Sequence, residues 1–387
     1  MKNNFYVILV FFLISCKESN DVNPLVNNNI KSIKIDLNEE AVEGNFDEYF
    51  SSSYLIQLET NEFSIISKID RISFYNNRIY ILDKKLNSVF IFSDKGKFLY
   101  KIKNIGKGPH EYISLTDFGI DEVNKQIVVY ADKPYKVIVY DLLGEFIEEK
   151  KLDKLYSNIA LMNGKMVLLN NETNREYMLQ EYDLSTNKKN SFLESNEIDE
   201  FYSEYALETP CIIKDRNIKI CLPYSDIIYE YNKNGFTAKY SLDFGRNKMP
   251  NKIYEQKVNI FDVYNYANEN NYGWGISNFR ETKDYITFSY LLNKLVIYSK
   301  KTKKSEVINS FYHKGLPFIN YFAHDGNDNK LISKFPAESF KNEMNTCKSK
   351  YPKKWSEIPD NIKKIAEDIN IDDNPLLIVY QFKNINN

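Results

Sequence analysis

Histidine, glycine and proline are scarce in this sequence. Its 387 residues include 3 His, 13 Gly and 11 Pro. The histidines, His110, His313 and His324, belong to no H-x-x-x-H, H-E-x-x-H or cysteine-containing metal pattern, so neither a zinc site nor another cofactor is predicted. The G-x-S-x-G elbow of many serine hydrolases is absent, and so is the spacing of a phosphate-binding loop. No familiar catalytic signature is therefore present.

Long blocks of like charge are missing as well. The 51 basic and 53 acidic residues are scattered along the chain and give a formal net charge of -2. Because binding to a phosphate backbone needs clustered Lys and Arg, a nucleic-acid partner is not predicted. Aromatic residues are abundant instead, with 30 Tyr and 25 Phe, and they favour strands over helices.

The N-terminus carries the clearest functional signal. Lys2 precedes an apolar stretch at residues 5–13 that is too short to span a bilayer, and Ser15 and Cys16 follow it. This arrangement resembles a bacterial lipobox, in which the Cys16 thiol would receive the lipid and become the mature N-terminus. Several acyl chains would anchor the protein stably in a membrane. The alternative is an ordinary secretory signal with an incidental cysteine. Residues 17–30 are polar and are predicted to form a tether.

Six apolar runs that end in an aromatic residue recur along the rest of the chain. Their last residues are Phe92, Tyr140, Tyr182, Tyr231, Tyr298 and Tyr380. The first four lie 42 to 49 residues apart, which is the length of one four-stranded propeller blade, and the last two spacings are 67 and 82. A second run, such as residues 79–82 or 127–130, precedes most copies and is apolar at successive positions. Strands of this kind are covered on both faces, which favours a propeller over a sandwich.

The sequence therefore predicts an all-β fold, a six-bladed β-propeller of four-stranded blades over residues 31–387. The last blade lacks a fourth strand, and residues 54–58 should supply it and close the ring. Residues 33–37 form a further candidate strand. The longer spacings hold insertions with helical signals at residues 251–270 and 338–369, which we expect to cap the blades.

Four segments carry a family resemblance. They are Leu58-Glu59-Thr60, Ile79-Tyr80-Ile81-Leu82-Asp83, Gly106-Lys107-Gly108-Pro109-His110-Glu111-Tyr112 and Asp372-Asp373-Asn374-Pro375. With them the chain resembles the TolB-like and NHL-like six-bladed β-propeller lipoproteins of Gram-negative bacteria, over residues 54–383. The resemblance implies the propeller fold and a location at the outer membrane, either periplasmic or surface-exposed. It implies no reaction. The family usually has Gly where this chain has His110.

The loop at residues 107–112 is the candidate ligand-binding site. It should join the outer strand of the first blade to the inner strand of the second and cross the face towards the channel mouth. Gly106, Gly108 and Pro109 permit a sharp turn. The residues that the turn would present are Lys107, His110, Glu111 and Tyr112. A purely structural turn is the alternative.

Two classes of function fit this sequence. The first is a lipid-anchored binding or scaffold protein that presents the propeller to a protein or a glycan. The second is a lactonase-like or lyase-like enzyme with a metal at the channel mouth, so whether the protein is an enzyme stays open. Three or more Asp, Glu, His or Asn side chains converging at that mouth would favour the enzyme.

Cys211 and Cys221 are a possible disulfide pair. A turn at residues 215–217 places them opposite each other in a hairpin, and export would take them to a compartment where disulfides form. Two buried, reduced cysteines are the alternative. Cys347 would be left unpaired.

Overall fold

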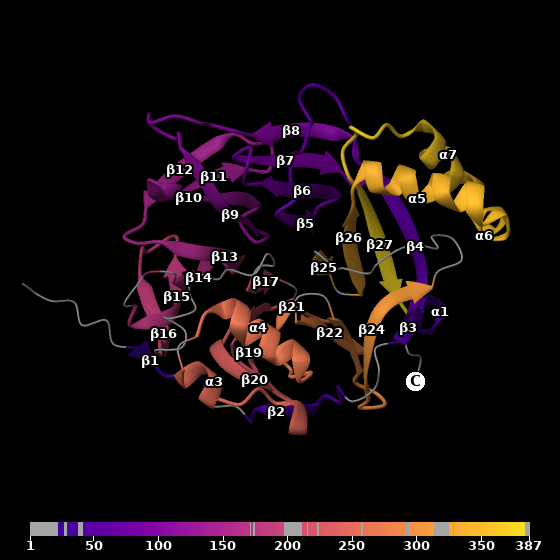
Figure 1. The fold of residues 1–387 in the computed structure, drawn as a ribbon. Helices are drawn as coiled ribbons and strands as arrows, with labels where there is room; N and C mark the ends of the chain where they lie inside the picture. The colour runs from indigo at the N-terminus through magenta and orange to yellow at the C-terminus, as the bar shows by residue number, and fades with distance from the viewer. Residues whose placement is uncertain are drawn as a thin grey trace, which may run out of the picture.

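The computed structural model describes residues 22–383 apart from 27–28, 38–41, 171, 173–174, 197–210, 215, 223, 257, 292–293, 313–324 and 328. Cys16, His313 and His324 lie outside the described residues. Six antiparallel four-stranded sheets stand around a common centre (Figure 1). The predicted all-β fold, a six-bladed β-propeller with a few short helices, is therefore confirmed.

The strands of each sheet are given from the innermost to the outermost. The first sheet holds β5 (Arg71–Tyr75), β6 (Arg78–Asp83), β7 (Ser88–Ser93) and β8 (Phe98–Ile102). The second holds β9 (Ser114–Asp121), β10 (Gln126–Lys133), β11 (Tyr135–Asp141) and β12 (Phe146–Lys151). The third holds β13 (Tyr156–Met162), β14 (Lys165–Asn170), β15 (Tyr177–Asp183) and β16 (Lys189–Glu194).

The fourth sheet holds β17 (Ile212–Lys214), β18 (Ile218–Cys221), β19 (Ile227–Asn232) and β20 (Gly235–Asp243). The fifth holds β21 (Ser277–Glu281), β22 (Tyr285–Tyr290), β23 (Lys294–Ser299) and β24 (Ser305–Tyr312). The sixth holds β25 (Asp325–Asn327), β26 (Lys330–Phe335), β27 (Leu376–Phe382) and β4 (Phe50–Gln57).

The middle strands are buried on both faces, as their continuous apolar sequences predict. Ile79, Tyr80, Ile81 and Leu82 of β6 have no exposed surface, and neither do residues 127–130 of β10. Odd and even positions of such a strand face the two neighbouring sheets, so both need apolar side chains. The core is accordingly divided among the gaps between neighbouring sheets.

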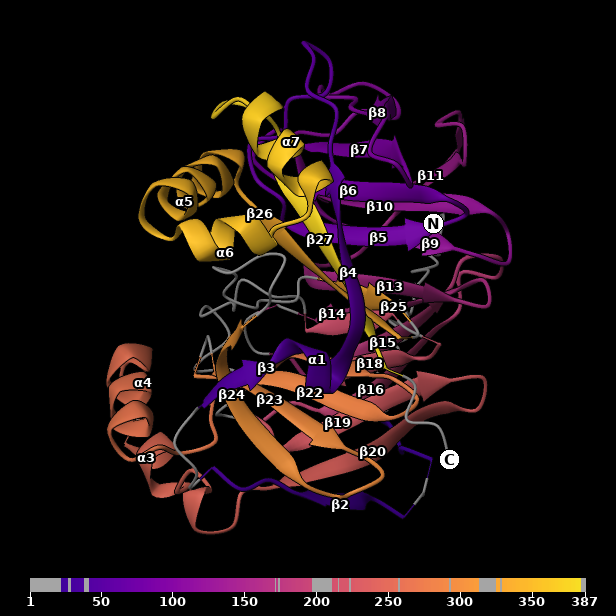
Figure 2. The ribbon, with the colours of Figure 1, turned by 90° about the vertical axis from the view of Figure 1, so that its right-hand side faces the viewer.

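Strand β4 closes the ring. It comes from the N-terminal part of the chain and pairs antiparallel with β27, with Ile56 opposite Leu377 and Tyr54 opposite Val379. Figure 2 shows it running along the outside of the sixth sheet. The predicted closing strand is confirmed.

The segment before β4 adds a parallel fifth strand to three successive sheets. These strands are β1 (Val22–Asn23) on β16, β2 (Lys31–Lys34) on β20 and β3 (Val42–Asn45) on β24. The candidate strand at residues 33–37 is thus confirmed in part. The prediction of a polar tether at residues 17–30 is wrong for residues 22–26. There β1 pairs with β16 and the Val26 N–H donates to the carbonyl of Phe236, because open strand edges offer backbone partners.

Both predicted helical insertions are present. The first contains η1 (Gly245–Asn247), α3 (Lys252–Glu255) and α4 (Ile260–Glu269), and the second contains α5 (Ala337–Lys350), α6 (Pro352–Glu357) and α7 (Asp360–Asp368). A short helix, α1 (Phe46–Tyr49), leads into β4. Helix α4 buries Val263 and Ala267 against the fourth and fifth sheets, and α5 buries Phe340 and Met344 against the sixth. Within the described ranges, no helix combines the length and apolar character needed to cross a bilayer.

Candidate functional site

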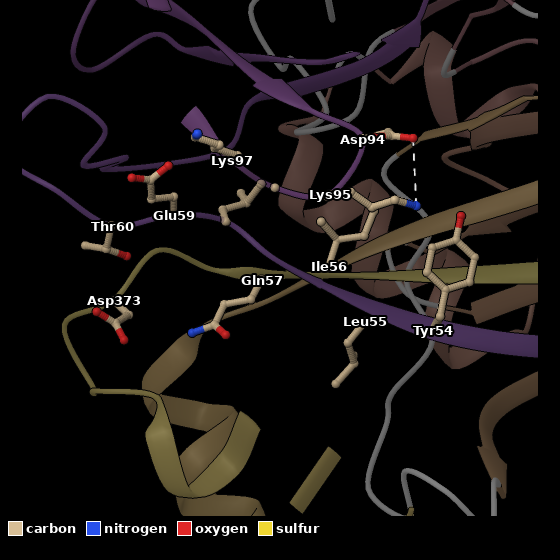
Figure 3. Close-up of a pocket in the computed structure, with 12 residues that line it drawn as sticks. Tyr54, Leu55, Ile56, Gln57, Glu59, Thr60, Asp94, Lys95, Lys97 and Asp373 are labelled. Carbon is tan, nitrogen blue, oxygen red and sulfur yellow. Dashed lines mark ion pairs between the residues drawn. The ribbon is translucent and has the colours of Figure 1, made fainter. Parts of the chain in front are cut away.

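An open groove of about 800 Å³ lies where the sixth sheet meets the first (Figure 3). One wall is β4 with the residues that follow it, and the other is the turn between β7 and β8. The lining residues are Tyr54, Leu55, Ile56, Gln57, Leu58, Glu59, Thr60, Asp94, Lys95, Gly96, Lys97 and Asp373. Charges of both signs stand around it, and 43% of the Tyr54 surface is exposed. The groove therefore offers a strand backbone, an aromatic ring and charged groups to a ligand.

Gly96 holds the two walls together. Its carbonyl accepts a hydrogen bond from the Glu59 N–H at 2.8 Å. Its φ is +83°, a conformation that L side chains rarely adopt, and a Cβ at this position would lie 2.0 Å from the carbonyl oxygen of Gln57. Only glycine satisfies both conditions, so the turn packs directly on the backbone of the closing strand.

Three of the segments that carry the family resemblance act in this region. The Asn374 side chain is 2% exposed and donates to the carbonyls of Glu59 at 2.9 Å and Ser64 at 2.8 Å. The Asn374 N–H donates to the Thr60 hydroxyl at 2.9 Å. Asp83, at the end of β6, accepts two backbone N–H bonds from the loop that precedes β5. These residues fix the loop that links the closing strand to the first sheet.

The groove is not predictable from any single segment of the sequence. Its residues come from three separate parts of the chain, which only the ring closure brings together. The available signal was that two of the family segments, at residues 58–60 and 372–375, flank the predicted closing strand and the last strand. Segments adjacent to paired strands must be neighbours in space.

The predicted site loop at residues 107–112 does not present its four side chains together. Tyr112 is fully buried, and its hydroxyl donates to the carbonyl of Asn87 at 3.1 Å. The Glu111 carboxylate accepts the Gly108 N–H at 2.7 Å and so closes the turn on itself. Lys107 is exposed. A role of Lys107, His110, Glu111 and Tyr112 in ligand binding stays a prediction.

His110 turns the loop towards the outside of the second sheet. The His110 ring lies 3.5 Å, centroid to centroid, from the Phe146 ring, and the backbone N–H of His110 donates to the Glu149 carboxylate at 3.1 Å. Both partners belong to β12, the outermost strand, so the predicted position near the channel mouth is wrong. The φ of His110 is +62°, which glycine adopts most easily. The backbone is thus one that the family's usual glycine would favour.

Polar residues of the inner strands link four sheets. The Asp117 carboxylate of β9 accepts bonds from Arg71 of β5 at 2.6 Å and from the Ile159 N–H of β13 at 2.8 Å. Asn158 donates to the same carboxylate at 3.4 Å and accepts the Cys211 N–H at 3.3 Å. The carboxylate is neutralised by the guanidinium and satisfied by the backbone, an arrangement that fastens neighbouring blades.

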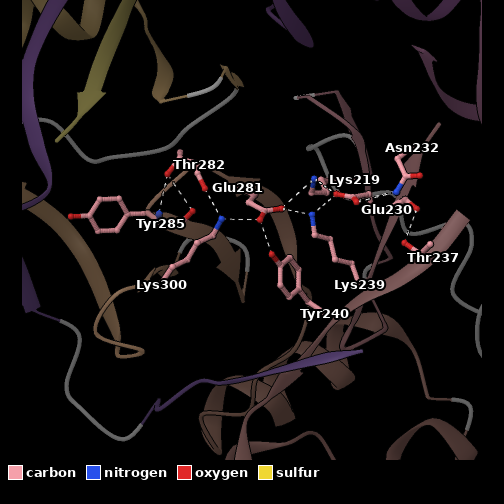
Figure 4. A network of polar contacts seen from close by, with 10 residues as sticks. All are labelled: Lys219, Glu230, Asn232, Thr237, Lys239, Tyr240, Glu281, Thr282, Tyr285 and Lys300. Carbon is pink, nitrogen blue, oxygen red and sulfur yellow. Dashed lines mark hydrogen bonds and ion pairs between the residues drawn. The ribbon is translucent and has the colours of Figure 1, made fainter. Parts of the chain in front are cut away.

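A group of buried and half-buried charges joins the fourth and fifth sheets (Figure 4). This charge cluster consists of Lys219, Glu230, Lys239, Tyr240, Glu281 and Lys300. Glu281 takes contacts from Lys239 at 3.1 Å and Lys300 at 2.8 Å. Lys219, with 4% of its side chain exposed, lies 2.6 Å from Glu230 and 3.2 Å from Glu281. Every charge has an opposite partner, so the cluster cross-links the two sheets.

Among the residues that the structure describes, no group of three His, Cys, Asp or Glu side chains is placed to hold a metal ion.

Cys211 and Cys221 lie opposite each other, as the hairpin count predicts. The Cys221 N–H donates to the Cys211 carbonyl at 2.9 Å, and both are free thiols in this structure. Burial raises the pKa of the Cys211 thiol to about 12 and that of Cys221 well above its usual value. The thiols are therefore poor nucleophiles. A disulfide between them stays a prediction.

One family profile matches most of the chain. A profile described as a domain of unknown function, DUF4934, matches residues 30–381. The search of curated proteins found no match.

Three solved structures are similar to this chain to different degrees. A protein of Bacteroides fragilis described as exported has a TM-score of 0.73 at 18% identity, over 92% of this chain and 100% of that one. The WD40 repeats of RRP9 reach 0.45 at 9% identity, over 85% and 97% of the two chains. Virginiamycin B lyase from Staphylococcus aureus reaches 0.39 at 12%, over 65% and 71%. The first match shows a shared fold.

Proposed function

The chain belongs to the DUF4934 family, and we propose that it is a binding protein of the cell envelope. Its rim groove, defined here as the groove along β4, would hold an extended segment of a partner protein. The similarity to a structure described as exported supports the location. The signal and lipobox pattern ending at Cys16 supports a lipid anchor in the outer membrane, compatible with either face.

This proposal rests on a difference among the outermost strands of the six sheets: within the described residues, three of them pair with an added fifth strand and three do not. The outermost strands of the third, fourth and fifth sheets each pair with a parallel strand from the chain's own N-terminal segment. In the described part of the chain, β4, β8 and β12 have no such fifth strand. Open strand edges are sites where another chain can add a strand.

An extended peptide is the ligand that the rim groove suits best. The chain's own strands demonstrate that the outer edges of this propeller accept a parallel strand. Beside β4 the groove leaves about 800 Å³ for the side chains of such a segment. Tyr54 supplies an exposed ring, and the lining includes both Lys97 and Glu59, so both signs of charge in a peptide find a partner.

Site-specific photocrosslinking in the native envelope tests the proposal. Full-length protein with p-benzoylphenylalanine in place of Tyr54 should form an adduct with another protein, because this side chain lies in the groove and is 43% exposed. The adduct is detected by its shift on a denaturing gel and identified by mass spectrometry.

The same probe at Phe261 is the control, since that residue is 72% exposed on α4, outside the groove. The same adduct at both positions would refute the groove as the binding site. Absence of an adduct at position 54, or an adduct with a second copy of this chain, would refute the proposed partner.

Replacing Cys16 with Ser should release the protein from membranes. The hydroxyl cannot accept the thioether-linked lipid, and the stable anchoring that several acyl chains provide would be lost. The measurement is the fraction of protein that sediments with membranes, together with incorporation of a labelled fatty acid. Ser15→Ala, which keeps a small residue before the cysteine, should remain anchored. Detergent-dependent extraction of the Cys16→Ser protein would contradict the lipid assignment.

A further inference from the structure

The second to fifth sheets carry their hairpin turns at one end of the propeller. In each of these sheets, short turns join the first strand to the second and the third strand to the fourth, and in an antiparallel sheet both turns lie at the same end. Contacts link the turns to one another. The Leu184 N–H donates to the Gly164 carbonyl at 3.4 Å, and the Lys214 ammonium lies 2.8 Å from the Glu122 carboxylate. The turn face is defined here as residues 122–125, 142–145, 163–164, 184–188, 216–217, 233–234, 282–284 and 300–304.

Exposed lysines gather on the turn face. Six of them come from five different turns, and none of the six forms an ion pair within the described part of the chain. The exposed acidic residues described on this face are Glu145 and Glu122, and Glu122 is paired with Lys214. The described links at the opposite end hold basic and acidic residues in nearly equal number. The turn face is therefore positive, although the net charge of the chain is -2. The six lysines are Lys125, Lys188, Lys233, Lys283, Lys303 and Lys304.

Two apolar side chains project from the same face. Val123 is 64% exposed and Leu143 is 68% exposed, and both lie in turns of the second sheet, next to the third. Apolar side chains can enter the boundary between lipid headgroups and acyl chains, while neighbouring ammonium groups meet the phosphates of anionic lipids. The combination suits the surface of a bilayer.

The lipid anchor proposed above would leave the protein beside the turn face. Strand β1 runs parallel to β16, and Val22 pairs with Ser191, just after the turn that ends at Lys188. Cys16 precedes Val22 by six positions. Whatever path the chain takes between them, the lipidated residue lies within about 20 Å of Val22, because this is the greatest length that six residues can span. The turn-face end of the third sheet is therefore held close to the bilayer.

We propose that the turn face docks on a bilayer that contains anionic lipid headgroups. The proposal rests on the lipid anchor of the proposed function: the acyl chains hold the protein at the membrane, and the lysines of the turn face then orient it. The third sheet and the sixth stand on opposite sides of the ring (Figure 1). The rim groove, where the sixth sheet meets the first, therefore lies across the ring from the anchor and stays open to a partner protein.

Fluorescence quenching by nitroxide-labelled headgroups tests the docking. The lipidated protein, with dansylalanine in place of Leu143, is reconstituted in phosphatidylcholine vesicles that contain about 30% phosphatidylglycerol. The dansyl group should be quenched, because the turn face lies at the level of the headgroups. Dansylalanine in place of Phe261, which is 72% exposed on α4 at the other end of the sheets, should not be quenched. Quenching at position 143 should disappear without phosphatidylglycerol or in about 1 M salt, since salt screens exposed charges.

A triple Lys→Gln variant of the turn face should weaken docking on the order of 100-fold, at about fivefold for each lysine. The matched control makes the same change at three exposed lysines of the opposite end and should leave the quenching unchanged. Circular dichroism establishes that each variant is folded. The turn-face variant carries Lys188→Gln, Lys233→Gln and Lys303→Gln, and the control carries Lys84→Gln, Lys85→Gln and Lys103→Gln.

The outcomes separate the docking from the anchor. Protein that sediments with the vesicles but is unquenched at position 143 would overturn the docking alone and would leave the turn face to a soluble anionic polymer. Protein that does not sediment would overturn the anchor and the docking together. Equal quenching with and without phosphatidylglycerol, or equal effects of the two triple variants, would also overturn the docking. None of these results affects the crosslinking at Tyr54.

Discussion

Replacing Glu281 with Gln is expected to lower the free energy of unfolding by about 3 to 5 kcal/mol at neutral pH, the usual cost of breaking a buried ion pair from one side. The side chain is 13% exposed and contacts three lysines of the charge cluster. The amide would leave those lysines with Glu230 as the one carboxylate of the cluster. Lys219, which is almost fully buried, would lose one of its two partners. Denaturant unfolding followed by circular dichroism measures the change.

The matched control is Glu148→Gln. Glu148 is 48% exposed and pairs with Lys150 at 3.6 Å, so its loss should cost less than about 0.5 kcal/mol. Adding Lys219→Met to Glu281→Gln should recover part of the loss, because one uncompensated charge is removed. Equal costs for the two Glu→Gln changes would show that the charge cluster does not cross-link the fourth and fifth sheets.

The same carboxylate makes stability depend on pH. Burial alone would raise the pKa of Glu281, but the charge of Lys219 and the hydrogen bond from Lys300 outweigh it and hold the pKa well below its usual range. The contribution is therefore fully present above the unfolded pKa of about 4.3 and is lost as the pH falls through the folded value. Below about pH 4, the unfolding free energy should fall more steeply in the parent protein than in Glu281→Gln.

Replacing Gly96 with Ala should lower the free energy of unfolding by about 3 kcal/mol, through backbone strain at a positive φ and a direct clash. The added Cβ would lie 2.0 Å from the carbonyl oxygen of Gln57, so either the turn or the closing strand must move. Because this contact joins the last sheet to the first, the displacement should also loosen β4. Denaturant unfolding measures the cost, and limited proteolysis within β4 reports the loosening.

Gly245→Ala separates the two causes. Gly245 also has a positive φ, +51°, but a Cβ there meets nothing within 4 Å. Its replacement should cost only about 1 to 2 kcal/mol for the left-handed conformation. If both changes cost the same, the close approach of Gly96 to Gln57 has no energetic consequence.

Much of the fold was predictable because the packing of neighbouring blades requires apolar residues at successive positions of the middle strands. Residues 79–82 and 127–130 are apolar at successive positions, and the structure buries them on both faces. The missing fourth strand of the last blade pointed to the closing strand, since an unpaired edge needs a partner. The polar tether at residues 17–30 was mispredicted in part because backbone pairing stabilises β1 whatever its side chains are.

The sites were less predictable. The rim groove and the turn face combine residues from separate parts of the chain. The loop at residues 107–112 was the more conspicuous local motif. Its direction depends on the contacts of His110 with β12, which local sequence does not encode.

The sequence by itself determined the number of blades, the strand that closes the ring and the places of the helical insertions, because two-sided burial and strand pairing impose a period on each segment. Only the tertiary structure decided which side chains share a site. Asn374 and Ser64 are 310 positions apart along the chain and form one hydrogen bond. Such contacts arise when the ring closes, and ring closure depends on backbone pairing that is nearly independent of the side chains that line the groove.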